Sequence, residues 1–170
     1  MSQVRVNAYT AAHASTFVAT GMLRGLKQII IGAGLSPSRL VDQWTTLETG
    51  VATWLKSGHL RRLTLEVWDP AKPTALVQRF DFSIDYGYYS DGDGNLWLDP
   101  QAVRQAITKA GSAPSACFYD IKISTAPDEP YVAGFETCTY RSTTGMRERS
   151  VGAVVGGGAL GASLSYWGRT

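Results

Sequence analysis

The chain has 170 residues, which at roughly 150 residues per domain predicts one domain and argues against a tandem enzyme. Its 16 Lys and Arg residues against 14 Asp and Glu residues leave a net charge of +2, so no bulk charge is available for binding nucleic acid. Hydrophobic residues make up 44% of the chain, which is in the globular range and excludes a mainly disordered protein.

The first residues, MSQVRVNAYT, contain no positively charged segment followed by an apolar one, so no secretory signal is expected. We therefore expect a cytoplasmic protein with reduced thiols. Cys117 and Cys138 form no CxxC pair and have no nearby pair of His residues. Both cysteines are expected to be buried as small hydrophobic residues rather than to bind metal.

Helical periodicity dominates the first third of the chain. Apolar residues recur at helical spacing from Val18 to Ile30, which predicts a first helix over about 12–31. Ser36 and Pro37 are typical of a helix start, and the same spacing then runs to Ser57. A second helix of about 20 residues is therefore expected.

The middle of the chain alternates in a period of two. Alternating segments near 63–68 and 76–86 predict an antiparallel hairpin with one apolar face. Asp99 and Pro100 predict the start of a third helix, which ends at Gly111, and residues 117–123 predict another strand. The expected order is α, α, β, β, α, β.

The remaining residues carry weak local signals. A faint strand pattern covers Phe135 to Arg141, and seven of the 18 glycines follow Thr144. The segment from Ser150 to Gly168 has no charge, but its many glycines make a poor membrane helix, so no membrane span is expected. We interpret it as extended backbone that docks on the domain, in more than one way, through apolar anchors. These anchors are Val151, Leu160, Leu164, Tyr166 and Trp167.

Two motifs suggest chemistry but do not fit their sites. Gly156, Gly158 and Gly161 spell GxGxxG, yet only nine residues follow, too few for the helix and strand of a dinucleotide site. Asp91, Asp93, Asn95 and Asp99 resemble ligands for a hard cation but lack the spacing of a calcium loop. We interpret them as a turn with a helix cap. No cofactor, functional metal or catalytic constellation is predicted, so the chain is not expected to be an enzyme.

Several longer stretches carry a family resemblance. They are VRVNAYT, SPSRLVDQW, WLKSGHL, DFSIDYGY with DGDGNLWLD, AITKAG, YRSTTGM and ASLSYW. Together they resemble the bacterial HORMA-domain proteins that accompany CD-NTase enzymes in CBASS antiphage systems. The resemblance covers nearly the whole chain and implies an α+β, HORMA-like fold. In that fold three helices pack on an antiparallel sheet, followed by a C-terminal region called the safety belt.

The resemblance also implies a function. In that family the belt wraps an extended peptide, the closure motif, by adding it to a sheet edge, and so acts as a conformational switch. The closed protein binds and activates the CD-NTase, and a hexameric AAA+ ATPase reopens it. For this chain the implied division is a single domain over 1–170, with a core at about 12–125 and a belt at about 131–170.

Residues can be assigned to this expected peptide site. The strand after the third helix is the expected edge, and the belt runs from about Tyr140 to Trp167. Two other functions stay open: a non-catalytic structural subunit of a larger assembly, and a small metal-dependent enzyme using Asp91, Asp93 and Asp99. The expected peptide-binding residues are Phe118, Tyr119, Asp120, Ile121, Lys122, Tyr140, Val151, Leu160, Leu164, Tyr166 and Trp167.

Overall fold

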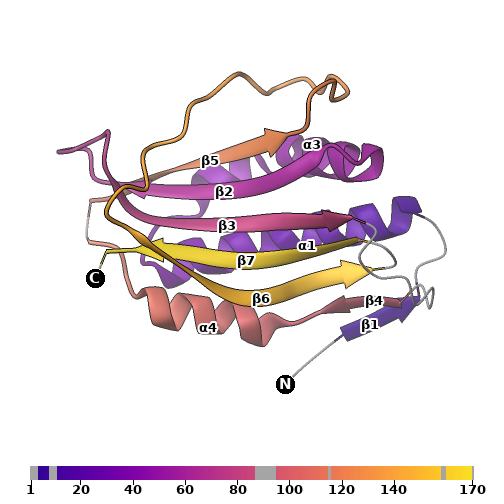
Figure 1. The fold of residues 1–170 in the computed structure, drawn as a ribbon, viewed down its shortest axis with the longest axis horizontal. Helices are drawn as coiled ribbons and strands as arrows, with labels where there is room; N and C mark the ends of the chain where they lie inside the picture. Colours follow the sequence, from indigo (N-terminus) through magenta and orange to yellow (C-terminus); the bar gives the residue numbers. More distant parts are fainter. Residues whose placement is uncertain (1–3, 8–10, 87–94, 115, 158–159, 170) are drawn as a thin grey trace.

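A computed structural model of the chain describes residues 4–7, 11–86, 95–114, 116–157 and 160–169. It contains one antiparallel sheet with helices on one of its faces (Figure 1). The helices are α1 (Ala11–Gly32), α2 (Ser38–Asp42), α3 (Trp44–Ser57) and α4 (Pro100–Ala110). The strands are β1 (Val4–Asn7), β2 (Leu60–Trp68), β3 (Leu76–Tyr86), β4 (Asn95–Leu98), β5 (Phe118–Thr125), β6 (Arg147–Gly157) and β7 (Leu160–Gly168).

The strands lie side by side in the order β1-β4-β6-β7-β3-β2-β5. The hairpin of β2 and β3 is the predicted one, with Leu65 opposite Phe80 and Leu63 opposite Phe82. The glycine-rich segment near the C-terminus forms β6 and β7, which pair with each other and join β4 to β3. The expected α+β architecture is confirmed, and both β1 and β4 are short strands that the sequence pattern did not indicate.

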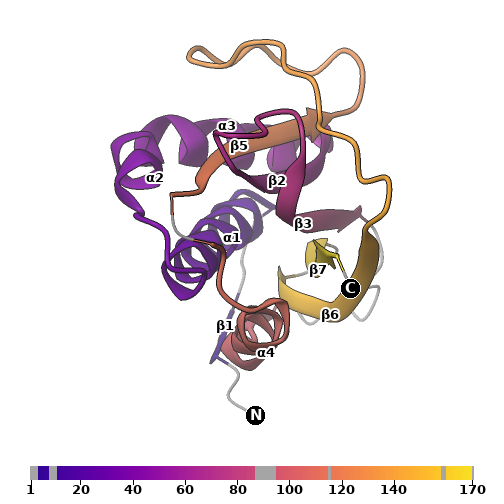
Figure 2. The same cartoon turned by 90° about the vertical axis from the view of Figure 1, so that its left-hand side faces the viewer.

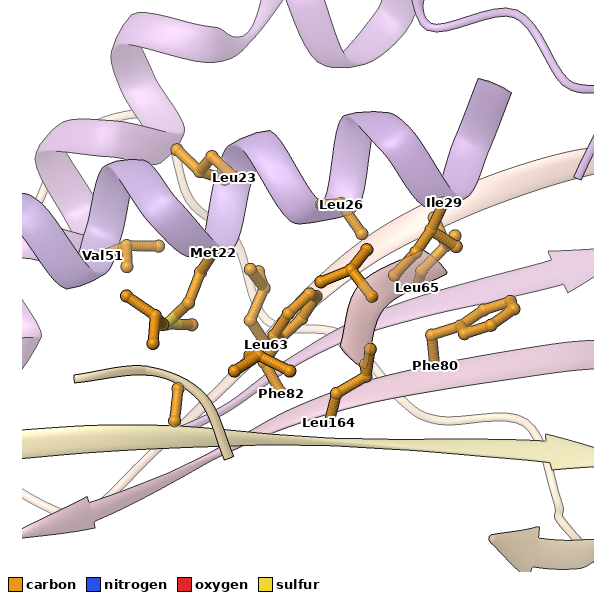
Figure 3. Close-up of a cluster of buried hydrophobic side chains, with 14 of the residues drawn as sticks. Met22, Leu23, Leu26, Ile29, Val51, Leu63, Leu65, Phe80, Phe82 and Leu164 are labelled. Carbon is orange, nitrogen blue, oxygen red and sulfur yellow. The ribbon is translucent and has the colours of Figure 1, made fainter. Parts of the chain in front are cut away.

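The main core lies between α1 and the sheet (Figure 3). Apolar side chains of α1 face those of β2, β3 and β7, as the helical and alternating patterns require. Gly21 allows α1 to lie close to the sheet, since an added Cβ would stand 2.9 Å from Val155 Cγ2. Fully buried members of this core include Met22, Leu26, Ile29, Leu63, Leu65, Phe80, Phe82 and Leu164.

The second predicted helix is in fact two helices. α2 ends at Asp42 and α3 begins at Trp44, with a break at Gln43. Leu40 of α2 and Val51 of α3 are both fully buried, so each piece packs against the core. α3 ends as expected, because Gly58 adopts a left-handed conformation with a φ of 80° and its N–H bonds to Leu55. Among the described residues, no helix has the length and hydrophobicity needed to cross a membrane.

Candidate functional site

The long strand β5 lies at one end of the sheet and pairs with β2. Just after β5, the N–H of Ala126 donates a hydrogen bond to the His59 carbonyl, so this N–H points toward the start of β2. At its start, the carbonyl of Tyr119 accepts a 2.8 Å hydrogen bond from Arg39 on α2. Backbone groups alternate along a strand, so those of Tyr119, Ile121 and Ile123 point away from β2. β5 thus offers a hydrogen-bonding edge of the kind that extended peptides join.

Residues 126–146, here called the bridging segment, cross this edge (Figures 1 and 2). The first half of the segment is fixed on the helix side. Trp54 Nε1 on α3 donates a 2.8 Å hydrogen bond to the carbonyl of Pro130, and its ring lies edge-on to Phe135 with centroids 4.9 Å apart. A Cβ at Gly50 would approach the Phe135 ring to 2.5 Å, so glycine is needed for this contact.

The second half of the segment is fixed on the opposite face of the sheet, around Glu66 of β2. The Glu66 carboxylate is fully buried and accepts hydrogen bonds from Lys122 Nζ at 2.7 Å, Arg141 Nη1 at 2.7 Å and the Arg141 backbone N–H at 3.0 Å. Lys122 also donates to the Thr139 carbonyl, and Arg141 to Asp120 at 2.9 Å. Burial disfavours the charge of Arg141, yet hydrogen bonds to Asp120 and Glu66 raise the pKa of its guanidinium.

Tyr140 lies among cations on the same face. The centroid of its ring is 5.0 Å from the Arg62 guanidinium, 5.3 Å from that of Arg79 and 5.6 Å from Lys122 Nζ. Burial raises the pKa of the Tyr140 phenol, so the ring stays neutral at ordinary pH. Trp167 also belongs to this cluster, because the Arg79 guanidinium lies over its indole, 5.6 Å from the ring centroid. The bridging segment thus passes from α3, across the edge of β5, to a charged and aromatic cluster.

The structure brings together only part of the expected peptide site. Phe118 through Lys122 form the start of β5, and Tyr140 packs against Lys122. Trp167 reaches the same face through Arg79. The four other residues lie on β6 and β7, from which β5 is separated by β3 and β2. They are Val151, Leu160, Leu164 and Tyr166, of which the last three are buried in the core.

Several residues of this site were missed by sequence reasoning. Within the alternating segment near 63–68, Glu66 falls on the polar face opposite the core, where solvent exposure is the ordinary outcome. The weak strand predicted over 135–141 is wrong, because these residues form an irregular crossing with no sheet partner. Arg141 belongs to that crossing, and its pairing with Glu66 spans 75 positions of sequence. An ion pair between residues so far apart in the sequence leaves no local pattern from which it could be predicted.

The alternative metal site rested on the acidic loop. Asp91 and Asp93 lie outside the described residues, whereas Asp99 caps α4 as expected, its Oδ1 accepting from the Gln101 N–H at 3.1 Å. In the part of the chain that the structure describes, no three His, Cys, Asp or Glu residues form a group able to hold a metal ion. The expectation that both thiols are buried is correct for Cys117 and wrong for Cys138, which is exposed on the bridging segment.

Comparisons with known proteins place this arrangement in a family. The family model described as Bacterial HORMA domain 2 matches residues 1–170. A search of curated proteins gives no match. Among solved structures, C. elegans HTP-2 bound to the HIM-3 closure motif has a TM-score of 0.72 at 13% identity, covering 95% of this chain and 93% of that one.

Two other solved structures extend the likeness of fold. A chain of the mitotic checkpoint complex has a TM-score of 0.72 at 9% identity and covers 92% of this chain and 98% of its own length. The E. coli MS115-1 CdnC:HORMA-deltaN complex contains a chain with a TM-score of 0.61 at 11% identity, covering 97% of this chain and 93% of that one.

Helices on one face of an antiparallel sheet, a free edge strand and a segment that crosses it define a HORMA fold in this chain. The protein belongs to the bacterial HORMA domain 2 family. The resemblance inferred from the sequence is therefore confirmed at the level of family and fold.

Proposed function

We propose that this protein is a peptide-binding signalling adaptor that captures an extended closure-motif peptide along β5. The observation that carries the proposal is the bridging segment, which is fixed to α3 on one side of the β5 edge and to Glu66 on the other. A peptide that pairs with Ile121 and Ile123 would lie beneath the crossing at 136–138. Backbone hydrogen bonds would supply affinity and the crossing would enclose the peptide.

The proposed site needs no large rearrangement of the core. The backbone groups proposed to pair with the peptide belong to β5, which is already paired with β2. The crossing is held by hydrogen bonds and ring contacts, which can open and re-form. Loosening the Glu66 contacts would free the crossing, admit a peptide and allow the segment to close again. A switch of this kind requires the peptide to interact more favourably with the closed arrangement than with the open one.

The peptide-bound form is proposed to bind and activate a CD-NTase nucleotidyltransferase in a CBASS antiphage system. Membership of the bacterial HORMA family supports this, and a solved complex of a similarly folded chain contains CdnC. A hexameric AAA+ ATPase is the proposed remodeller that reopens the belt. The adaptor itself would perform no chemistry and act in the cytoplasm.

The peptide mode can be tested without knowing the natural motif. The whole chain is immobilised and used to select from a displayed library of random 12-residue peptides, and the dissociation constants of enriched peptides are measured. Ile121→Pro removes an N–H from the free edge but leaves the pairing with β2 in place, so it is expected to weaken binding at least tenfold. Ile121→Ala is the matched control, because it removes the side chain and keeps the N–H.

Two further measurements decide the outcome. Proline placed at alternate positions of an enriched peptide should abolish binding, while proline at the intervening positions is tolerated, because only alternate residues donate to β5. Equal binding by the two Ile121 variants, both folded by circular dichroism, would contradict pairing at this edge. Failure to enrich any peptide would favour the structural-subunit alternative. Activation is tested by adding an enriched peptide to the adaptor and the nucleotidyltransferase encoded beside it and measuring nucleotide turnover.

A further inference from the structure

Arg39 on α2 stands beside the start of the β5 edge. Its Nη1 donates to the Tyr119 carbonyl at 2.8 Å, and its guanidinium carbon lies 5.7 Å from the centroid of the Tyr119 ring. The Tyr119 hydroxyl in turn donates to the Ser36 carbonyl at 2.6 Å. These contacts hold a cation at the point where a peptide ladder along β5 would reach its end.

Arg39 is the most exposed of the cations that form ion pairs in this region. Across the β5 edge, on the face opposite the helices, the side chains of Arg79, Lys122 and Arg141 are 7%, 12% and 16% exposed and each is bonded to a carboxylate. Arg62 on that face is 35% exposed and lies 3.9 Å from Asp81. The Arg39 side chain is 58% exposed.

Asp120 forms an ion pair with Arg39 but accepts no hydrogen bond from it. Its Oδ1 lies 3.9 Å from Arg39 Nη1, beyond hydrogen-bond distance, while its Oδ2 accepts from Arg141 at 2.9 Å. A guanidinium has five N–H donors in a planar fork that matches the two oxygens of a carboxylate. The Tyr119 carbonyl uses one of these donors, so the exposed part of the fork is available to a ligand.

We propose that Arg39 is a specificity-determining residue that recognises a carboxylate at one end of the bound peptide. The ligand is therefore an extended peptide with an acidic group where it passes Tyr119. The group is either an Asp or Glu side chain or the terminal carboxylate, which have the same chemistry. This inference rests on the proposed peptide binding at β5. Because the site is open to solvent, the expected preference for the acidic peptide is roughly fivefold to tenfold.

A purely protective role makes a different prediction. If Arg39 only shields the edge strand from unwanted pairing, its removal changes the binding of acidic and neutral peptides equally. If Arg39 reads a carboxylate, its removal affects the acidic peptide alone. The comparison of the two effects therefore separates recognition from protection.

The experiment repeats the 12-residue selection on wild-type protein and on Arg39→Gln. Enrichment of Asp or Glu at one peptide position, or of a free C-terminus, is expected with wild type and lost with the variant. Synthetic peptides that carry Glu or Gln at that position, each with a free or an amidated C-terminus, then identify which carboxylate is read. Arg104→Gln is the matched control, since Arg104 is an exposed arginine on α4 bonded to Gln101.

The outcomes are distinguishable. A fivefold or larger preference for one carboxylate in wild type and in Arg104→Gln, reduced to less than twofold in Arg39→Gln, supports the assignment. Peptides that bind at β5 with no acidic preference, or with a preference unchanged in Arg39→Gln, overturn the assignment and leave the proposed function standing. If neither protein enriches any peptide, the proposed function fails and the role of Arg39 fails with it.

Discussion

The two faces of β2 are both buried, but by different chemistry. Toward the helices, Leu63, Leu65 and Val67 are fully enclosed by apolar side chains. Toward the other side, Thr64 and Glu66 are equally enclosed, yet their neighbours are charged groups, in part from the bridging segment. The first face stabilises the fold through non-directional burial, whereas the second fixes where one segment lies.

This difference has an energetic basis. Each apolar side chain removed from water adds roughly 1.5 to 3 kcal/mol to stability wherever it packs. A buried ion pair gains far less in net terms, because desolvation of both charges offsets most of their attraction, but losing one partner is costly. We therefore expect the packing of the helices against β2, here called the permanent cover, to stay in place. The bridging segment over Glu66, here called the outer cover, is expected to open as a unit.

The largest expected effect is loss of the permanent cover. Phe82→Ala removes a fully buried ring from the contact with α1 and is expected to lower the free energy of unfolding by about 3 to 5 kcal/mol. Urea unfolding followed by circular dichroism measures this change. Phe118→Ala changes a residue of β5 that is 52% exposed, and it should lower the free energy of unfolding by less than about 1 kcal/mol. Comparable losses in the two variants would refute the contrast between the faces.

The second effect is release of the outer cover alone. Glu66→Gln removes the charge that holds Lys122 and Arg141, and is expected to lower the free energy of opening the bridging segment by about 3 kcal/mol. Amide hydrogen exchange should accelerate on the order of a hundredfold in residues 139–146 and little in α1. Glu148→Gln, which changes an exposed carboxylate on β6, is the control. Uniform acceleration across both regions would mean that the outer cover does not open separately.

A smaller effect concerns the anchor on the helix side of the crossing. Phe135→Ala deletes the edge-on contact with Trp54 and should cost about 1 kcal/mol, with faster exchange near 130–136. Tyr131→Ala changes a ring that is 88% exposed and should have no measurable effect. If both variants behave like wild type, α3 does not anchor the bridging segment.

The smallest expected effect is a pH dependence at the end of β3. Burial raises the pKa of Tyr86 to about 12, and its hydroxyl donates a hydrogen bond to the Leu60 carbonyl. A tyrosine in the unfolded chain titrates near 10, so between about pH 10 and 12 the unfolded state binds fewer protons and stability falls. Urea midpoints should therefore decline more steeply with pH in wild type than in Tyr86→Phe. Parallel declines would show that Tyr86 makes no contribution.

Much of the permanent cover could be predicted from the sequence, because its signals are local. The helical period of α1 and the alternation of β2, β3 and β5 each lie within about 20 residues and report directly which side is buried. The break at Gln43 was not visible, since the apolar spacing continues through it. The glycine-rich segment was predicted to be extended, but its pairing as the hairpin of β6 and β7 was not. The glycines of this segment indicate no preferred strand partner.

The outer cover depends on pairs that are distant in sequence. Glu66 is 56 positions from Lys122 and 75 from Arg141, and Arg39 is 80 from Tyr119. A charged residue at an outward strand position has the same pattern whether it is solvated or enclosed. Family resemblance supplied the edge strand and the belt, but it could not assign the residues that fix the crossing.

The crossing over β5 also affects how copies of the protein behave toward one another. β1, at the opposite edge of the sheet, has only four residues, whereas β5 has eight, of which Ile121 and Ile123 are apolar. A long edge strand of that kind is a template for pairing between molecules and for aggregation. The bridging segment, which passes from α3 across this edge to Glu66, and Arg39, which is bonded to the Tyr119 carbonyl, stand in the way of such pairing. Keeping the segment closed therefore serves solubility as well, and variants that loosen it are expected to self-associate at high concentration.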